Sequence, residues 1–490
     1  MTDVVVIGAG PAGVFAALRA AELGARTALV ASADFGGMAA NDGPVPVRAL
    51  AYAARLIREA RELPRYGITA NEPVLDYGRL LARVREIVHD VSTRAALRER
   101  VDAFGVTLHE QSGAARFTDS HTVETERGLK LRADRFIVCT GGVSRRLAIP
   151  GFELTSSHSD TWRLTKVPPS MLVIGAGHTG VQVASMFNDF GTRVHLFEAG
   201  ARILRSEDED VAAAVASGLR ESGVVVHERF GNLTSFEKTS TGVRMNFRTG
   251  DSDAHAEAAL AVVAVGWVAD TGPLNLAQVG VEVDARGTIK VDEFLRTSAS
   301  HIFAAGDVTG RLMVVPGAIE DGFVAATNAV EGPTQPLRHR VSPSGTFTHP
   351  EYAQVGLTEA KAREGDEVLT TVVPFDGAVR AIIEGRTFGF CKLVVHRRSY
   401  RILGCHVVGE RAVEIVQLAA VAMAADMPVD ELARVAVSFP TYAEVLVHAA
   451  VRAAAELQLP LGGQAAQVRG TFIGPIQLIA SNRRHGVTVT

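Results

Sequence analysis

Two glycine-rich segments of this chain repeat the spacing Gly-x-Gly-x-x-Gly. They are Gly8-Ala9-Gly10-Pro11-Ala12-Gly13 and Gly175-Ala176-Gly177-His178-Thr179-Gly180. In this spacing the first glycine permits a tight turn, the second lets a diphosphate approach the backbone, and the third lets a helix pack on a strand. The helix that follows directs its first N–H groups at the phosphates. The segments therefore predict two dinucleotide sites, and ligand-free glycine turns are the alternative interpretation.

Each segment lies between an apolar, strand-like run and a helical stretch, and a second apolar run follows. The predicted strands and helices are residues 4–7, 14–23 and 27–30 in the first unit and 171–174, 181–190 and 193–197 in the second. This order of strand, turn, helix and strand occurs twice, 167 residues apart (175 − 8). A glycine-rich turn in a complete βαβ unit is a stronger signal than the motif alone.

Further predicted strands end in glycine or polar residues. Strand 136–139 ends at Thr140-Gly141, strand 261–265 ends at Gly266, and strand 301–305 ends at Gly306-Asp307. Open α/β sheets bind ligands at the carboxyl ends of their strands. Asp307 is therefore expected to bring a carboxylate to a ligand site.

Glu198 follows the second strand of the second unit, 23 residues after Gly175. A carboxylate at this place accepts hydrogen bonds from the ribose hydroxyls of NAD and repels a 2′-phosphate. NADH is therefore favoured over NADPH. The nearby Arg202 and Arg205 keep NADPH open, and a solvated glutamate at a strand end is the other interpretation.

The composition fits a large α/β protein and argues against other classes. Lys and Arg total 50 against 54 Asp and Glu, so the net charge of −4 gives no basic surface for nucleic acid. No apolar run reaches the roughly 18 residues of a membrane helix, so no membrane insertion is expected. The cysteines, Cys139, Cys391 and Cys405, have no metal-site spacing and are too few for a disulfide framework. They predict buried, inert thiols, no metal site and a cytoplasmic location.

These motifs resemble the pyridine nucleotide–disulfide oxidoreductase family, in the branch of dihydrolipoamide dehydrogenase, mercuric reductase and glutathione reductase. The likeness covers about residues 3–455, and its most specific stretches are 8–13, 304–307 and 347–359. It implies an α/β fold with two Rossmann-like domains, one for FAD and one for NAD(P), followed by a C-terminal α+β dimerisation domain. It also implies a homodimer.

The resemblance implies an FAD domain that is split around an inserted NAD(P) domain. The expected parts are 1–150 and 271–335 for FAD, 151–270 for NAD(P), 342–462 for dimerisation and 463–490 as a C-terminal tail. By the same likeness, Asp307 would bind the ribityl chain of FAD, and Thr140 and Gly141 would line the flavin.

The segment that carries the redox disulfide in the family has no cysteine here. In residues 36–48 the two cysteine positions are occupied by Ala39 and Pro44. The acid/base histidine of the family's closing motif is replaced by Phe439, in Phe439-Pro440-Thr441-Tyr442-Ala443-Glu444. Neither alanine nor proline provides a thiolate. Dithiol–disulfide exchange is therefore not expected.

Other departures from the family bear on catalysis. Arg48 replaces a lysine and Gln182 a glutamate, so an ion pair beside flavin and nicotinamide becomes a guanidinium–amide hydrogen bond. Ala39, Pro44, Phe439 and Tyr442 are expected to form an apolar pocket for a planar, quinone-like acceptor. Tyr442 would place its hydroxyl at the edge of this pocket, beside the retained Glu444. His178 either gates the nicotinamide or is a spacer, and His448 is a less favoured substitute proton donor.

The resulting hypothesis is an FAD-dependent NAD(P)H oxidoreductase. Hydride passes from nicotinamide to flavin and then directly to a small acceptor. A pyridine nucleotide transhydrogenase is one alternative. A non-catalytic or regulatory nucleotide-binding dimer is another, and it is favoured by Ala31, which stands where the family has an acidic residue for the FAD ribose. Ser32 and Asp34 are the substitutes that the sequence offers.

Overall fold

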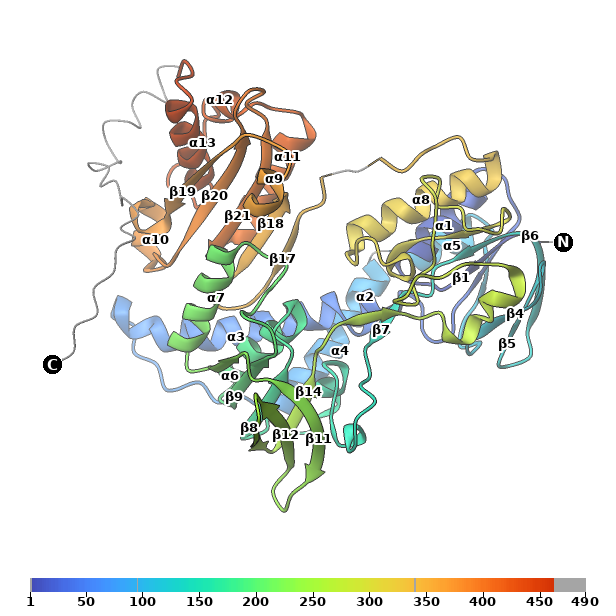
Figure 1. Ribbon diagram of the computed structural model, residues 1–490, viewed down its shortest axis with the longest axis horizontal. Coiled ribbons are helices and arrows are strands. Elements are labelled where there is room, and N and C mark those ends of the chain that lie inside the picture. Colours follow the sequence, from blue (N-terminus) through green and yellow to red (C-terminus); the bar gives the residue numbers. More distant parts are fainter. Residues whose placement is uncertain (1, 95, 339–340, 462–490) are drawn as a thin grey trace. The chain divides into compact units, whose positions relative to one another are not determined.

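Short runs of β-branched and aliphatic residues build the central sheet of the first unit. Val4 to Ile7 of β1 (Thr2–Ile7) are all buried, as expected for a parallel strand that is covered on both faces. β1 pairs in parallel with β2 (Thr27–Val30) and β6 (Lys130–Val138). β3 (Thr107–His109) extends the sheet beyond β2, and β16 (Ile302–Ala304) pairs in parallel with β6. Residues near 302 therefore complete a sheet that begins at the N-terminus (Figure 1).

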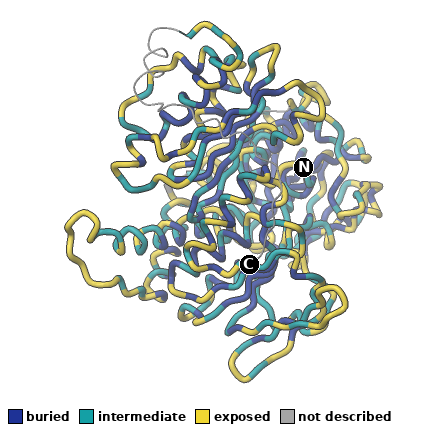
Figure 2. Tube along the Cα trace, turned by 60° about the vertical axis from the view of Figure 1, so that its left-hand side comes forward, coloured by how far each residue is buried: buried dark blue, intermediate teal, exposed yellow. Residues whose placement is uncertain are grey.

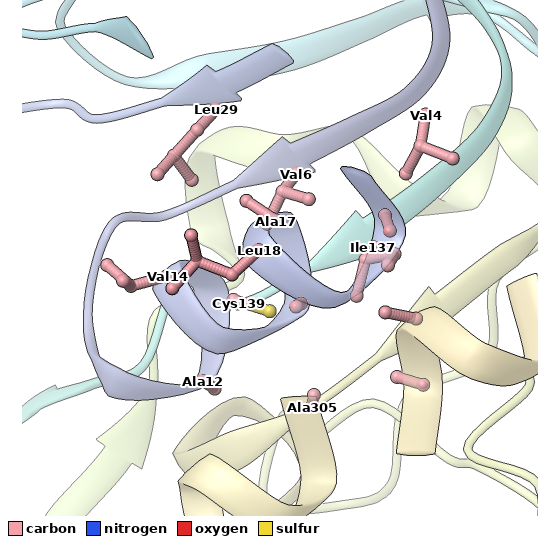
Figure 3. Packing of buried hydrophobic residues seen from close by; sticks show 14 of the residues in the cluster. Val4, Val6, Ala12, Val14, Ala17, Leu18, Leu29, Ile137, Cys139 and Ala305 are labelled. Atoms are coloured by element: carbon pink, nitrogen blue, oxygen red, sulfur yellow. The ribbon is translucent and has the colours of Figure 1, made fainter. Parts of the chain in front are cut away.

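Two helices that are distant in sequence pack together on this sheet. α1 (Pro11–Glu22) contacts α8 (Val315–Glu331) along much of its length. A side chain at Gly322 would place its Cβ only 2.1 Å from the carbonyl oxygen of Ala12, so glycine permits this close approach. Figure 3 shows the core beneath α1, where Val14 and Leu18 lie near Val6, Ile137 and Cys139.

The remaining elements of this part surround the central sheet. β4 (Ala115–Asp119) and β5 (Thr122–Thr125) continue it beyond β6 with antiparallel pairing. The other helices are α2 (Gly37–Asn41), α3 (Pro44–Glu62), α4 (Tyr77–Arg94) and α5 (Leu97–Ala103). Within the first unit, α3 contacts α6 (His178–Asp189), and Arg58 of α3 forms an ion pair with Asp189 of α6.

A second parallel sheet carries the second glycine turn. Its strands, in spatial order, are β10 (Val225–Glu228), β9 (Arg193–Glu198), β8 (Ser170–Ile174) and β14 (Leu260–Val263). Its helices are α6 (His178–Asp189) and α7 (Glu209–Glu221). An antiparallel sheet packs on it, formed by β11 (Asn232–Lys238), β12 (Val243–Thr249) and β13 (Ser252–Ala258). β7 (Gly142–Ser144) pairs with β15 (Trp267–Ala269), which joins the chain segments on either side of this insertion.

The chain divides into two units between His349 and Pro350. In the second unit four antiparallel strands lie in the order β18 (Tyr352–Gly356), β21 (Ile402–Gly409), β20 (Gly389–His396) and β19 (Val368–Pro374). α11 (Ala412–Ala424) packs on β18 and β21, and α13 (Glu444–Glu456) packs on β19 and β20. The shorter elements near this boundary and in the second unit are β17 (Ser344–Thr346), α9 (Glu359–Arg363), α10 (Val379–Glu384) and α12 (Val429–Leu432).

The computed structural model describes residues 2–94, 96–338 and 341–461. In Figure 2 the buried residues follow the strands, whereas the exposed residues gather on loops and outer helix faces. The predicted βαβ units are confirmed, although α1 and α6 each begin three residues earlier than expected. Pro11 has a backbone angle suited to the first helical position, so α1 begins there. The predicted tail, 463–490, lies outside the described residues, and the predicted domain limits stay predictions. Within the described residues, none of the helices has the length and apolar character needed to cross a membrane.

Candidate functional site

The first glycine turn has one open position between two closely packed ones. A Cβ at Gly8 would lie 2.2 Å from the carbonyl oxygen of Cys139, and one at Gly13 would lie 1.7 Å from that of Gly8. At Gly10 a Cβ would meet nothing within 4 Å. The helix α1 begins directly after Gly10. The packing therefore requires glycine at both ends of the turn, and the backbone between them is accessible to a phosphate group.

The second glycine turn has the same geometry. A Cβ at Gly175 would lie 2.4 Å from the carbonyl oxygen of Ala264, and one at Gly180 would lie 1.8 Å from that of Gly175. Gly177 precedes the first residue of α6, and a Cβ added there would meet nothing within 4 Å, as at Gly10. The residues at both turns thus fit the diphosphate of a dinucleotide.

Asp307 lies beside the first glycine turn and the β7–β15 pair. A Cβ at Gly306 would lie 3.0 Å from the Cβ of Ala12, and one at Gly142 would lie 3.7 Å from that of Asp307. Asp321 of α8 accepts a hydrogen bond from the backbone N–H of Gly306 (3.3 Å). Burial raises the pKa of Asp307, and the nearby carboxylate of Asp321 raises it further. The fold therefore places a half-buried carboxylate next to the first glycine turn, and its contact with FAD stays a prediction.

Thr140, Gly141 and Gly266 lie at the carboxyl ends of the two parallel sheets. The hydroxyl of Thr140 donates to the carbonyl of Asp270 (2.7 Å), and the N–H of Asp270 donates to the carbonyl of Gly141 (3.0 Å). Gly141 and Gly266 have φ values of +78° and +111°, which favour glycine. A Cβ added at either glycine would meet no atom within 4 Å. These residues link the two dinucleotide-binding regions, and their direct contact with cofactor stays a prediction.

Glu198 is fixed at the edge of the second turn. Its Oε2 accepts a hydrogen bond from the N–H of Ala176 (3.0 Å), and its Oε1 accepts one from the N–H of Gly200 (2.7 Å). Arg202 donates to the carbonyls of Leu204 and Glu207 (2.8 Å each) and so stabilises its own loop. Arg202 is one of the two arginines that left NADPH as an alternative, and its guanidinium is bound to backbone carbonyls of its own loop.

His178 is the first residue of α6, and its side chain is turned towards the loop that follows β9. Its Nε2 lies 3.2 Å from Oε1 of Glu207 and 3.4 Å from the hydroxyl of Ser206. From the sequence, His178 was interpreted as a gate or a spacer, and Glu207 was not identified as its partner. Only the tertiary contact between α6 and this loop identifies the pair.

Residues 36–48 form the short helix α2 and the start of α3 beside the first glycine turn. A Cβ at Gly37 would lie 2.8 Å from Cα of Gly10, which shows how closely the two segments approach. Ala39 lies in α2, and Pro44 is the first residue of α3. Cys139, Cys391 and Cys405 are all buried and without a disulfide, and burial raises the pKa of the Cys139 thiol strongly. The prediction of inert thiols is consistent with these environments.

The side chains of Arg48 and Gln182 each contact another part of the first unit. The guanidinium of Arg48 lies 3.3 Å from the ring centroid of Phe347, and the side-chain amide of Gln182 donates to the carbonyl of His178 (3.2 Å). The direct hydrogen bond expected between the two side chains is therefore still a prediction. The cation–π contact itself is a feature that the sequence did not suggest.

In the second unit, Tyr442 and Glu444 have contacts that hold the domain together. The hydroxyl of Tyr442 donates to Glu384 (3.0 Å), and Glu444 accepts from the N–H of Val379 (2.8 Å). Both residues are buried, and the expected place of the Tyr442 hydroxyl at the edge of an acceptor pocket stays a prediction. Burial lowers the pKa of His448, which makes it a poorer proton donor at neutral pH. Phe439, in contrast, is 65% exposed.

Ala31 stands where the family has an acidic residue, and the structure places a chain segment beside it that the sequence did not indicate. Ala31 is buried, and its N–H donates to the carbonyl of His109, the last residue of β3. Glu110 follows directly and accepts a hydrogen bond from the N–H of Phe35 (3.0 Å). Asp34, one of the suggested substitutes, accepts from the side chain of Gln111 (2.6 Å). Glu110 therefore follows the residue that hydrogen-bonds to Ala31, because β3 lies beside β2, and its carboxylate also pairs with Arg98.

Comparisons with known proteins agree with this arrangement. Residues 2–322 match the model of the family "Pyridine nucleotide-disulphide oxidoreductase", and residues 342–450 match that of its dimerisation domain. A mercuric reductase from Bacillus cereus is 32% identical over 452 residues, which cover 91% of this chain and 70% of the relative. A dihydrolipoyl dehydrogenase from Zymomonas mobilis is 34% identical over 466 residues, covering 92% and 97%. The solved HOCl-induced flavoprotein disulfide reductase RclA from Escherichia coli aligns with a TM-score of 0.80 and 25% identity, covering 91% of this chain and 99% of RclA.

Proposed function

This chain belongs to the pyridine nucleotide-disulphide oxidoreductase family, and we propose that it is an FAD-dependent oxidoreductase that uses NADH to reduce a small acceptor without a redox disulfide. The family binds FAD and NAD(P)H, and the α/β fold with a dimerisation domain is that of its members. The proposal concerns the route of the electrons, the acceptor and the preferred nucleotide.

The observation that carries the proposal is a contrast within the first unit. Both glycine turns keep the packed and open positions that a dinucleotide requires. The segment that begins beside the first turn has Ala39 and Pro44 at the places of the family's two cysteines, and Phe439 stands at the place of its histidine. The remaining thiols are buried. The proposal is thus that the two dinucleotide sites are retained and that the cysteine pair and the histidine of the family are lost.

The chain's own residues would bind and orient the two coenzymes. The N–H groups at the starts of α1 and α6 would hold the two diphosphates. Asp307 would accept a hydrogen bond from the ribityl chain of FAD, and Glu198 would accept one from the ribose of NADH. When bound, FAD supplies the two-electron chemistry, so the protein needs no nucleophile of its own. A second copy of the chain, bound through the dimerisation domain, is part of this proposal, as is the cytoplasmic location.

The electron route is tested by a titration and an acceptor panel. Anaerobic addition of NADH to the purified protein should bleach the visible flavin band, and a quinone should restore it. Lipoamide should restore it no faster than buffer alone, because residues 36–48 contain no cysteine. A flavin band unchanged by NADH and by NADPH would contradict the proposal, and rapid turnover of lipoamide would contradict the absence of thiol chemistry.

The nucleotide preference is tested by the variant Glu198→Ala. We expect KM for NADH to rise about ten- to one-hundred-fold and KM for NADPH to change much less, because a charged hydrogen bond contributes about 1.5–3 kcal/mol. Glu198→Gln is the matched control, since its amide oxygen still accepts a hydrogen bond from one of the N–H groups that Glu198 holds. Equal losses for both nucleotides would assign Glu198 to loop structure only.

Ala31 favours a second candidate, a regulatory dimer that keeps the fold and has lost its flavin. The absorbance spectrum separates the two. A colourless protein that takes up no added FAD would support the regulatory function, whereas a yellow protein would assign the ribose contact to another group, for which Glu110 is one candidate.

A further inference from the structure

The side chains of His178 and Glu207 are in contact at the opening of the second glycine turn. Oε1 of Glu207 lies 3.2 Å from Nε2 of His178. The side chain of Glu207 is fully buried, whereas that of His178 is 45% exposed. The carboxylate is thus the fixed member of the pair, and the imidazole is the member that faces outwards, one residue after the open position at Gly177.

The loop around Glu207 is held by several backbone contacts. The N–H of Glu207 donates to the carbonyl of Leu204 (3.0 Å), and the N–H of Leu204 donates to the carbonyl of Ala176 within the glycine turn (2.9 Å). Arg202 donates to the carbonyl of Glu207 (2.8 Å). These bonds tie the position of the carboxylate to the position of the turn itself.

This geometry determines which hydrogen-bond donor the imidazole offers to a ligand. When Nε2–H donates to the carboxylate, Nδ1 carries a second proton only in the imidazolium form. The side chain of Glu207 is fully buried, and an imidazolium at His178 would place a positive charge beside its carboxylate. The pair then presents an Nδ1–H donor at a helix N-terminus, where the aligned N–H groups already favour an anion.

We propose that Glu207 is a positioning residue that holds His178 as a cationic donor to the diphosphate of the nicotinamide dinucleotide. This inference rests on the second dinucleotide site of the proposed function. It also replaces the gate considered for His178, because a side chain held by a buried carboxylate and a tied loop does not swing aside to admit the nicotinamide.

The test compares two ligands that share the diphosphate and differ in the nicotinamide. Dissociation constants of NADH and ADP-ribose are measured by calorimetry for the holoprotein and for the variants Glu207→Gln and His178→Gln. We expect each variant to weaken both ligands by about the same factor, roughly ten-fold, as for the loss of one charge-assisted hydrogen bond at a partly exposed site. The double variant should lose no more than the single ones, since both act through one contact.

Two further variants separate positioning from general effects. Glu209→Gln removes the same charge from an exposed residue two positions along and should leave both constants unchanged. Glu207→Asp keeps the carboxylate and should recover part of the affinity that Glu207→Gln loses. If Glu207→Gln unfolds, His178→Gln alone decides, because its side chain is partly exposed.

The outcomes are distinct. Loss of NADH affinity with unchanged ADP-ribose affinity would place His178 at the nicotinamide and overturn the inference. Unchanged affinity for both ligands would also overturn it, while the proposed function stands. If the unmodified protein binds neither ligand, the second dinucleotide site and the proposed function fail together.

Discussion

The variant Gly10→Val should purify as a folded but colourless protein. Its Cβ would meet no protein atom within 4 Å, and its backbone angles, φ −76° and ψ −176°, are allowed for any residue. The new side chain would therefore occupy only the space where the diphosphate of FAD is expected. We predict a more than 100-fold loss of FAD affinity with an unchanged melting temperature of the flavin-free protein, measured by absorbance and thermal unfolding.

The matched variant is Gly177→Val, which makes the same change in the second turn. Its backbone angles are nearly the same, φ −78° and ψ −173°, and its Cβ would also meet nothing. This protein should keep its yellow colour and lose reduction by NADH. Retention of FAD by the Gly10→Val protein at normal affinity would contradict the assignment of the first turn.

The variant Arg58→Met should destabilise the first unit by about 3 kcal/mol in urea unfolding. Arg58 of α3 pairs with Asp189 of α6, and the two side chains are only 18% and 6% exposed. Removing one member of a buried pair leaves the other charge uncompensated, which typically costs about 3–5 kcal/mol. If the Arg58→Met protein is as stable as the unmodified protein, the ion pair contributes nothing to the α3–α6 contact.

Two controls and a pH series define the origin of this effect. Arg83→Met on α4 breaks the exposed pair with Glu86 and should cost less than about 1 kcal/mol. The double variant Arg58→Met/Asp189→Leu should recover most of the loss, since it buries no charge.

Burial raises the pKa of Asp189 to about 6 from an ordinary value of 3.8, against the opposing effect of Arg58. Between about pH 4 and 6 the folded protein therefore holds a proton that the unfolded chain has released, and this contribution to stability falls as pH rises. Asp189→Asn should remove that slope.

The expectation about the thiols needed no structure. The absence of cysteine from residues 36–48 is a fact of the sequence, and the resemblance to the family implies that Phe439 replaces its histidine. The two glycine motifs also predicted their βαβ units correctly, because a tight turn between strand and helix requires glycine whatever surrounds it. Such local constraints depend on neighbouring residues, so a linear pattern contains them.

The contacts of individual side chains were not readable in the same way. The sequence did not indicate that the hydroxyl of Tyr442 donates to Glu384, 58 residues away in the chain. Nor did the sequence indicate that the guanidinium of Arg48 lies over the ring of Phe347, whereas the expected hydrogen bond between Arg48 and Gln182 stays a prediction. In each case a flexible polar side chain had several chemically suitable partners, and only packing selected one of them.

The sequence by itself predicted two glycine turns suited to dinucleotides, because these follow from residue type and spacing, and its resemblance to the family implies the loss of the thiol pair. The tertiary structure decided which distant groups lie beside each turn. Glu110 reaches the position beside Ala31 because β3 pairs with β2, and Glu207 reaches His178 because the loop after β9 hydrogen-bonds to the second glycine turn. Strand order and loop packing depend on the whole folded chain, and no local pattern specifies them.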